Sequence, residues 1–190
     1  MSGARNWLRR LAMLLALSAG SLAASAPNAA QGPGGDHWVA DADDQFLLDV
    51  NIRQLRLGDG VRAYNTPEGT CVVLGDFLTT LDVPMRIDLT AKKASGWAFR
   101  EANRISIDHA AGTASYGDKS EPIAPGTIRE TPEGWCVQTA ALTRWFGIGV
   151  KPVTSGSVLI LQSEAKLPVE LAIERQKRAQ RLEPAKFDLN

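Results

Sequence analysis

Apolar and polar residues begin to alternate near Gln45, and the alternation predicts β-structure. Leu48–Ile52 places an apolar side chain at every second position, which is the period of a half-buried strand. The pattern resumes at Leu55–Leu57, and Gly58–Gly60 (GDG) offers turn chemistry before Val61–Tyr64 becomes apolar again. We therefore expect a hairpin or a meander over residues 45–64.

A seven-residue motif occurs twice in the chain. Thr66–Val72 (TPEGTCV) and Thr131–Val137 (TPEGWCV) share six of seven residues at an offset of 65. Apolar positions downstream match at the same offset, pairing Phe77 with Leu142, Leu81 with Phe146, Val83 with Ile148 and Met85 with Val150. Because the match extends beyond the motif into shared apolar positions, we interpret it as an internal duplication.

Each copy predicts the same run of elements. The Pro-Glu-Gly sequence favours a tight turn, Cys-Val begins a strand, and residues 74–81 or 139–146 form two helical turns. Gly147 suits a left-handed residue that ends a helix. A closing strand is expected at Gly96–Arg100 in the first copy and at Ser157–Gln162 in the second. The predicted fold class is α+β, with two tandem β-rich repeats whose short helices cover one face of antiparallel sheet.

These patterns divide the chain into units. Residues 45–102 form the first β-α-β repeat and residues 103–166 the second, with 103–128 expected to supply a leading hairpin for the second copy. Residues 167–190 hold a C-terminal helix and the start of a further segment. Pro168 begins this helix, and its acidic residues precede its basic ones, as the helix dipole favours. Its apolar stripe of Val169, Ile173 and Leu182 is thin, so the helix either docks by one edge or projects as a connector.

The N-terminus has the pattern of a secretory signal peptide over residues 1–26. Three arginines precede the apolar run Leu11–Leu17, and small residues follow up to Ala26. Residues 27–44 are then expected to form a disordered linker. The chain has 21 basic and 21 acidic residues, and removing three arginines with the signal leaves a net charge of −3. Nucleic acid is therefore not an expected partner.

Composition limits the chemistry. The chain has 190 residues, 44% of them hydrophobic, and only two histidines and two cysteines, too few for a conventional Cys/His zinc site. Cys71 and Cys136 occupy equivalent repeat positions in a chain that we expect to reach an oxidising compartment. They form either a disulfide or two separately buried thiols, and we favour the disulfide.

No catalytic template is found. The sequence contains no G-x-S-x-G, H-E-x-x-H or P-loop motif, and the His109–Asp108 pair has no accompanying nucleophile. Trp97, Trp135 and Trp145 could stack on sugars, although aromatic residues at strand and helix positions are more often core. We predict no catalytic, cofactor-binding or metal-binding residues, and no cofactor.

Two resemblances bear on function. Gly69–Leu78 and Gly134–Leu142 resemble the copper amine oxidase N-terminal-like repeat, a small module that acts as a stalk or binding unit. Leu48–Tyr64 and Leu167–Leu171, together with Gly96-Trp97 and Arg144-Trp145-Phe146, are similar to the periplasmic N-terminal region of usher-like outer-membrane proteins. In that group a β-barrel follows in the same polypeptide, so the resemblance implies a linked barrel or an envelope protein as partner.

The expected function is a non-catalytic periplasmic accessory module of an usher-like outer-membrane assembly or secretion protein. It would contact its partner through a sheet edge or a groove between the two copies, and would reach the membrane only through a partner or barrel. The alternative is a free-standing periplasmic or cell-wall binding protein for glycan or peptide.

Overall fold

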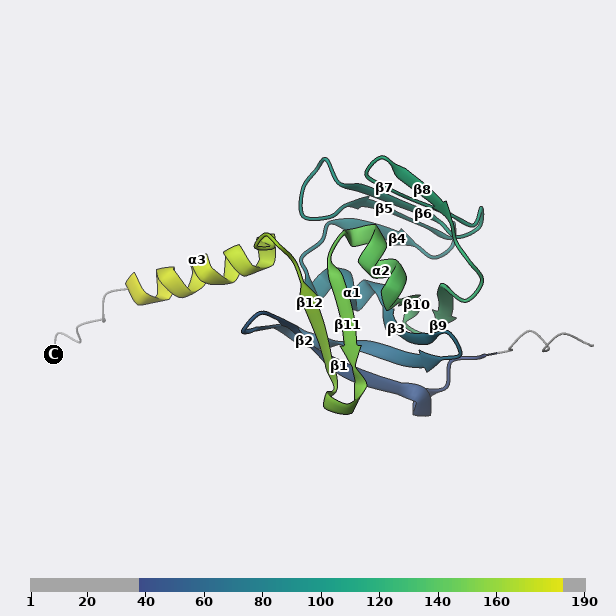
Figure 1. Ribbon diagram of the computed structural model, residues 1–190, viewed down its shortest axis with the longest axis horizontal. Coiled ribbons are helices and arrows are strands. Elements are labelled where there is room, and N and C mark those ends of the chain that lie inside the picture. Colours follow the sequence, from purple (N-terminus) through teal and green to yellow (C-terminus); the bar gives the residue numbers. More distant parts are fainter. Residues whose placement is uncertain (1–37, 183–190) are drawn as a thin grey trace, which may run out of the picture. The chain divides into compact units, whose positions relative to one another are not determined.

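The computed structural model describes residues 38–182, which fold into two β-sheets with two short helices between them and a third helix at the end (Figure 1). The first sheet has seven strands in the order β11-β12-β1-β2-β3-β10-β9, and all neighbours are antiparallel except β1 and β12. Its strands are β1 (Gln45–Ile52), β2 (Leu55–Thr66), β3 (Gly69–Val73), β9 (Ile128–Thr131), β10 (Gly134–Gln138), β11 (Gly149–Val153) and β12 (Val158–Gln162).

The second sheet is an antiparallel meander of five strands in sequence order. These are β4 (Met85–Asp88), β5 (Lys93–Trp97), β6 (Arg104–Asp108), β7 (Thr113–Tyr116) and β8 (Lys119–Pro122). The helices are α1 (Leu74–Thr80), α2 (Thr139–Phe146) and α3 (Pro168–Leu182), and the 3-10 turns are η1 (Ala42–Asp44) and η2 (Thr154–Gly156). The predicted α+β class is confirmed.

The main core lies between the two sheets, where α1 and α2 fill the space (Figure 1). The four matched apolar residues of the helical segments, Phe77, Leu81, Leu142 and Phe146, are all buried. The rings of Phe77 and Phe146 meet edge to face, with centroids 5.2 Å apart. The helical segments of the two sequence copies therefore pack against each other in one core, through a contact between non-equivalent positions.

The two matched segments form the same elements and then diverge. Each runs strand, two-residue turn, strand and helix, as β2-β3-α1 and as β9-β10-α2. Strands β3 and β10 pair antiparallel with Val72 opposite its equivalent Val137. After the helices, β4 and β5 enter the five-stranded sheet, whereas β11 and β12 extend the seven-stranded sheet, where β12 lies beside β1.

The first hairpin turns earlier than the glycines indicated. Its turn is Arg53-Gln54, and Gly58–Gly60 lies inside the continuous strand β2. Leu48 pairs with Val61 and Val50 with Leu57, so three residues of β2 lie opposite one residue of β1. Gly58 and Gly60 have φ angles of 59° and 96°, which permit this bulge.

Two other sequence predictions are wrong in position. The closing strand of the first copy is Lys93–Trp97, because the backbone leaves the sheet at Ala98 and Phe99 takes a φ of 62°. The segment 103–122 does not form a leading hairpin for the second copy. Its strands β6–β8 instead pair onward from β5 to complete the meander, and β9 alone precedes β10. Chain connectivity favours this result because consecutive strands usually pair.

The prediction of a disordered linker at residues 27–44 is wrong for the part that the structure describes, residues 38–44, which is ordered and includes η1. Trp38 packs on the outer face of the seven-stranded sheet, edge to face with Tyr64 at a centroid distance of 6.0 Å. The predicted signal peptide at residues 1–26 lies outside the described residues. None of the helices in the described part of the chain combines the length and hydrophobicity that a membrane span requires.

Candidate functional site

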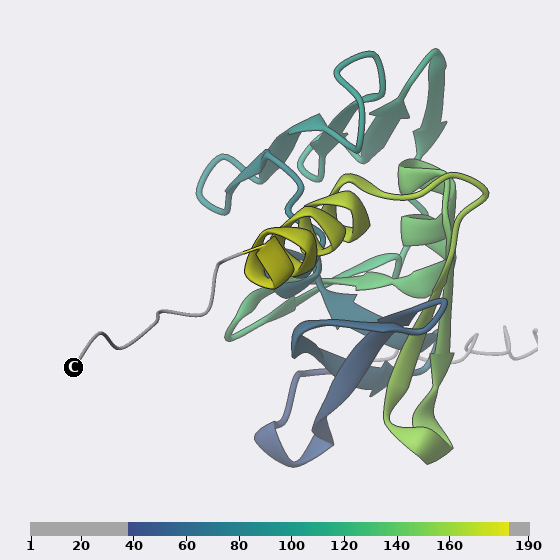
Figure 2. The same cartoon turned by 90° about the vertical axis from the view of Figure 1, so that its left-hand side faces the viewer.

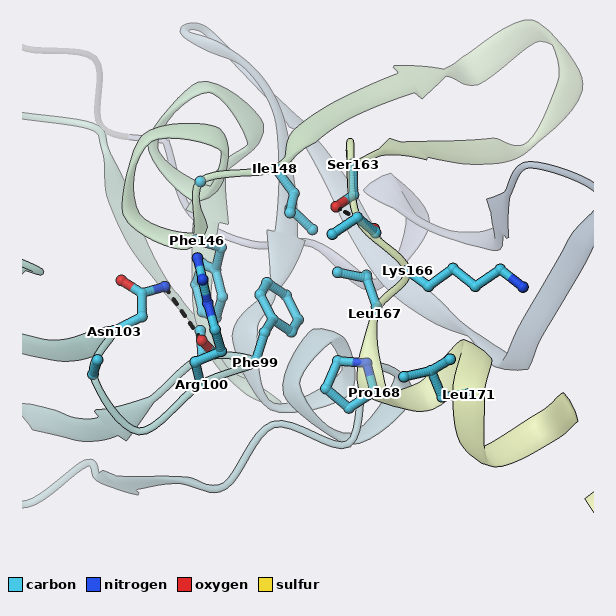
Figure 3. A pocket seen from close by; sticks show the side chains of 14 residues that line it. Phe99, Arg100, Asn103, Phe146, Ile148, Ser163, Lys166, Leu167, Pro168 and Leu171 are labelled. Carbon is cyan, nitrogen blue, oxygen red and sulfur yellow. Dashed lines mark hydrogen bonds between the residues drawn. The ribbon is translucent and has the colours of Figure 1, made fainter. Parts of the chain in front are cut away.

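A hollow of about 720 Å³ lies at the base of α3 (Figure 3). Three segments that are far apart in sequence surround it: the β5–β6 loop, the corner between α2 and β11, and the link between β12 and α3. Its principal apolar lining residues are Phe99, Phe146, Ile148, Leu167 and Leu171. The hollow thus joins residues of both sequence copies and the C-terminal helix.

The β5–β6 loop is closed by its own hydrogen bonds. The Ala98 N–H donates to the Asn103 carbonyl at 2.9 Å, and the Asn103 N–H donates to the Arg100 carbonyl at 2.9 Å. The Asn103 side-chain amide adds a bond to the Ala98 carbonyl at 3.3 Å. Phe99 occupies the left-handed region between these residues, which is a strained conformation for a bulky side chain. Its ring lies 6.4 Å from that of Phe146 and forms part of the pocket wall (Figure 3).

The α2–β11 corner is fixed by Gly147. This residue has a φ of 66° and donates its N–H to the Thr143 carbonyl at 3.1 Å, as a glycine that ends a helix does. The sharp turn places Phe146 and Ile148 on either side of the corner, and both line the hollow. The sequence prediction for Gly147 is confirmed and accounts for this wall.

The third wall is fixed by an ion pair between a turn and a helix. The Arg53 guanidinium, in the β1–β2 turn, donates to both carboxylate oxygens of Glu170 at 2.5 and 2.7 Å. It also donates to the Ser163 carbonyl at 2.8 Å. Glu170 is only 2% exposed and accepts the Leu167 N–H at 2.8 Å, so it caps the helix whose first turn carries it.

The rim of the hollow is basic. Arg100 and Lys166 line it, and no carboxylate is among its lining residues. Lys166 pairs with Glu174 at 2.5 Å, whereas within residues 38–182 Arg100 has no ion-pair partner. A smaller hollow beside it shares Arg100 and Ser163 and adds Glu164. Chemically, the site can accept an apolar group in its interior and an anionic group at its rim.

A second cluster lies on the outer face of the seven-stranded sheet. Cys71 and Cys136 form a disulfide there with a Cα–Cα distance of 5.3 Å, which confirms the prediction. The two sulfurs are buried beside Tyr64 and Val73. The disulfide joins β3 to β10 and therefore links the two sequence copies covalently.

Polar residues around the disulfide cross between the copies. The Tyr64 hydroxyl donates to Glu133 at 2.6 Å, and the Gln45 amide donates to Glu133 at 2.7 Å. The hydrogen bond from Tyr64 lowers the pKa of Glu133 by more than burial raises it. Burial and the bond to Glu133 both raise the pKa of Tyr64. At neutral pH the pair is thus a tyrosine hydroxyl bonded to a carboxylate.

The equivalent residues of the two copies form a second contact, in which the copies exchange roles. Arg129 is the equivalent of Tyr64 at the offset of 65, and its guanidinium bonds Glu68, the equivalent of Glu133. Burial raises the pKa of Glu68, but hydrogen bonds led by the one from Arg129 outweigh it and leave this pKa lowered. The Arg129 guanidinium also lies over the Trp38 ring, 5.7 Å from its centroid. The turn glutamate of each copy therefore binds the strand residue of the other.

The other residues singled out in the sequence are dispersed. Trp135 and Trp145 are buried, with the indole N–H of Trp145 donated to Glu121 at 2.8 Å, and Trp97 is half-buried. His109 packs edge to face on Trp135 at 5.5 Å. Two of these three tryptophans are thus core residues and cannot stack on a ligand. Within residues 38–182, no group of three or more His, Cys, Asp or Glu side chains is placed to hold a metal ion.

Sequence reasoning missed three residues that build the hollow. The left-handed backbone conformation of Phe99 cannot be recognised in the sequence, because the folded loop imposes it and the adjacent residue types do not. Arg53 was not recognised as a turn residue because Gly58–Gly60, which begins five residues later, has the stronger turn pattern. Glu170 was identified only as a helix-dipole residue, although its place three residues after Leu167 is the spacing of a capping carboxylate.

No family model, no curated protein and no solved structure matches this chain. Its function is therefore inferred from its own residues.

Proposed function

We propose that the chain is a non-catalytic, exported interaction module of the cell envelope. In this proposal it is periplasmic and works beside, or linked to, an usher-like outer-membrane barrel, with no cofactor or metal. The signal pattern at residues 1–26 supports export, and the disulfide between Cys71 and Cys136 is compatible with an oxidising compartment.

The observation that carries the proposal is the course of α3. Its start is fixed to the body by buried Leu167 and Glu170, and Val169 and Ile173 pack against the core. From Arg175 to Arg181 every residue is exposed; Figure 1 shows the helix leaving the sheets, and in Figure 2 it points toward the viewer in front of them. A helix that is polar all round gains nothing from the body it leaves, and such helices typically bridge to something else. This geometry supports a connector or a contact arm.

We further propose that the chain is a tandem duplication in which the two copies share one sheet. The support is the repeated TPEG motif, the β-β-α order of both segments and the pairing of Val72 with Val137. The exchanged contacts of Tyr64 with Glu133 and of Arg129 with Glu68 relate the copies as an approximate twofold axis would. On this proposal neither copy is complete without the other.

The hollow at α3 is a better contact surface than the sheet edges. The edge strands β4, β8 and β9 have four residues each, and β11 carries Lys151 and Pro152. Short edge strands, and edge strands that carry lysine or proline, resist pairing with a strand of another chain. The hollow, in contrast, is apolar inside and has an exposed leucine, Leu171, at its border. We therefore place the partner contact there.

The experiment is affinity capture with the purified mature chain. Periplasmic and outer-membrane fractions are passed over the immobilised chain, and the bound material is identified by mass spectrometry. The proposal expects a defined envelope protein that binds reproducibly and competes with free chain. Recovery of glycan alone, with no protein, would contradict it and favour the alternative of a glycan-binding protein.

A further inference from the structure

The exposed part of α3 carries a concentration of positive charge that the fold does not use. Its basic residues are Arg175, Lys177, Arg178 and Arg181, and no acidic residue follows Glu174 in this helix. Within residues 38–182 none of these four takes part in an ion pair. Such a local excess of positive charge attracts groups of opposite charge.

Two of the four basic residues, Arg175 and Arg178, lie on the same face of α3 as Leu171. Leu171 borders the hollow, and Arg175 and Arg178 follow it at spacings of four and seven residues, so all three share one helix face. Lys177 lies about 120° around the helix axis from Leu171 at 3.6 residues per turn. Leu171, which borders the hollow, and the two arginines therefore lie in one line over roughly 10 Å of helix, since each residue adds about 1.5 Å.

We propose that this surface binds an acidic segment of a partner protein, with one apolar side chain in the hollow and carboxylates along Arg175 and Arg178. The proposal rests on the interaction function proposed above and specifies its partner. The apolar lining accounts for the anchor, and the unpaired guanidinium groups account for the acidic residues beside it. Arginine suits this role because its planar group binds carboxylates through two parallel hydrogen bonds.

A protein segment fits this surface better than a membrane does. Helices that lie on membranes insert a broad apolar face, whereas over residues 168–181, whose side chains the structure describes, the exposed face of α3 contributes one large apolar residue, Leu171. The apolar area is concave and enclosed by three segments, which suits a single side chain and not a flat layer of headgroups. An anionic membrane is therefore the competing outcome of the test.

The test uses the intact mature chain and a fluorescein-labelled peptide with one phenylalanine followed by a run of glutamates. Two matched peptides replace either the glutamates by glutamines or the phenylalanine by alanine. Fluorescence anisotropy should show binding of the first peptide only, and the binding should weaken as salt is added because the charges are exposed. Vesicles of phosphatidylcholine with and without phosphatidylglycerol are measured in parallel.

Variants assign the binding to this surface. Arg175→Glu with Arg178→Glu should weaken peptide binding about tenfold, because two exposed attractions become repulsions. Lys177→Glu makes half of this charge change on another face of the same helix and should have far less than half the effect on the binding free energy. Leu171→Gln tests the border of the hollow and should also weaken binding. These side chains are exposed, and circular dichroism checks that each variant is folded.

The outcomes separate the two proposals. Equal binding of the glutamate and glutamine peptides, no binding at all, or equal effects of the double variant and Lys177→Glu would overturn the inference. So would tight binding of anionic vesicles that displaces the peptide. If the captured envelope protein binds the double variant as well as the parent chain, only the docking surface is wrong. If no envelope protein is captured by either chain, the interaction function itself is wrong.

Discussion

Cys71 and Cys136 occupy the position where the two matched segments meet. Each lies next to the central pair Val72–Val137, and their side chains share the outer face of the sheet with Tyr64. Residues at equivalent positions of the two copies lie close together across antiparallel strands only when the strand register is symmetric about an equivalent pair, which here is Val72 and Val137. The register of β3 and β10 therefore brings two cysteines that are 65 residues apart within bonding distance.

Removing this disulfide should destabilise the chain strongly. In the chain-entropy account, closing a loop of this length stabilises the folded state by about 4 kcal/mol. We expect the Cys71→Ser/Cys136→Ser variant to lose stability of that order in urea unfolding followed by tryptophan fluorescence. The parent chain under a reducing agent should approach the variant, and the variant should not respond to the reductant. Equal stability of parent and variant would show that the sheet register holds without the bond.

Asp76 is the carboxylate whose surroundings predict a response to acid. It accepts hydrogen bonds from the Arg62 guanidinium at 2.7 Å and from the Arg62 N–H at 3.0 Å. Burial raises the pKa of Asp76, but the bonds from Arg62 outweigh it and leave this pKa below its ordinary value. The folded state therefore holds its proton less tightly than the unfolded state does. The stabilisation is present above the ordinary carboxyl pKa, about 4, and is lost as the pH falls below it.

Asp76→Asn should thus reduce both stability and acid sensitivity. We expect a loss of about 1–3 kcal/mol at pH 7, since charged hydrogen bonds are removed from a partly buried site. Urea midpoints of parent and variant should converge as the pH is lowered to about 3. The control Asp49→Asn disrupts an exposed pair with Arg56 and should cost less than about 1 kcal/mol. A constant gap between parent and variant across this range would contradict the assignment.

At the scale of elements, the sequence predicted what depends on local pattern. Residues 74–81 and 139–146 carry periodic apolar positions and form α1 and α2, and Pro168 begins α3 as expected. The Pro-Glu turns and Gly147 also follow from local chemistry. The bulge at Gly58–Gly60 could not be distinguished from a turn, because glycines with positive φ serve both. Phe99 shows the same limit, since its strain is imposed by the loop around it.

Docking of α3 depends on contacts that only the folded chain assembles. Glu170→Ala would remove the carboxylate that the Arg53 guanidinium and the Leu167 N–H bind, although Arg53 would keep its bond to the Ser163 carbonyl. We expect a loss of about 1–3 kcal/mol for these bonds. Hydrogen exchange of the first turn of α3 should accelerate while that of β1 and β2 changes less, because the helix start is released.

Glu174→Ala is the matched control for this variant. It is one helical turn further along and pairs with the exposed Lys166. Exposed pairs contribute about 0–1 kcal/mol, so hydrogen exchange of α3 should change little. Equal effects of the two variants would mean that the buried carboxylate has no special part in holding the helix.

At the scale of the molecule, the topology was only partly accessible from sequence. The repeated motif indicated two equivalent segments, and their shared element order agrees with that. The sequence pattern does not show that the strands after the two helices enter different sheets, because apolar residues alternate in both, at Met85 and Ile87 and at Ile148 and Val150. β4 forms a local hairpin with β5 and so enters the five-stranded sheet, whereas β12 joins the seven-stranded sheet through its long-range pairing with β1. The hollow at α3 arises from this divergence and could not be foreseen.

We propose above that the hollow and α3 contact an envelope protein. The most direct measurement places a photo-crosslinking residue, benzoylphenylalanine, at position 171 and, in a second variant, at position 47. Leu47 is 52% exposed and Leu171 41%, so both sites reach solvent, but only Leu171 borders the hollow. After irradiation in intact envelopes, we predict a discrete protein adduct from position 171 and none from position 47. No adduct from position 171, or the same adducts from both positions, would contradict the claim.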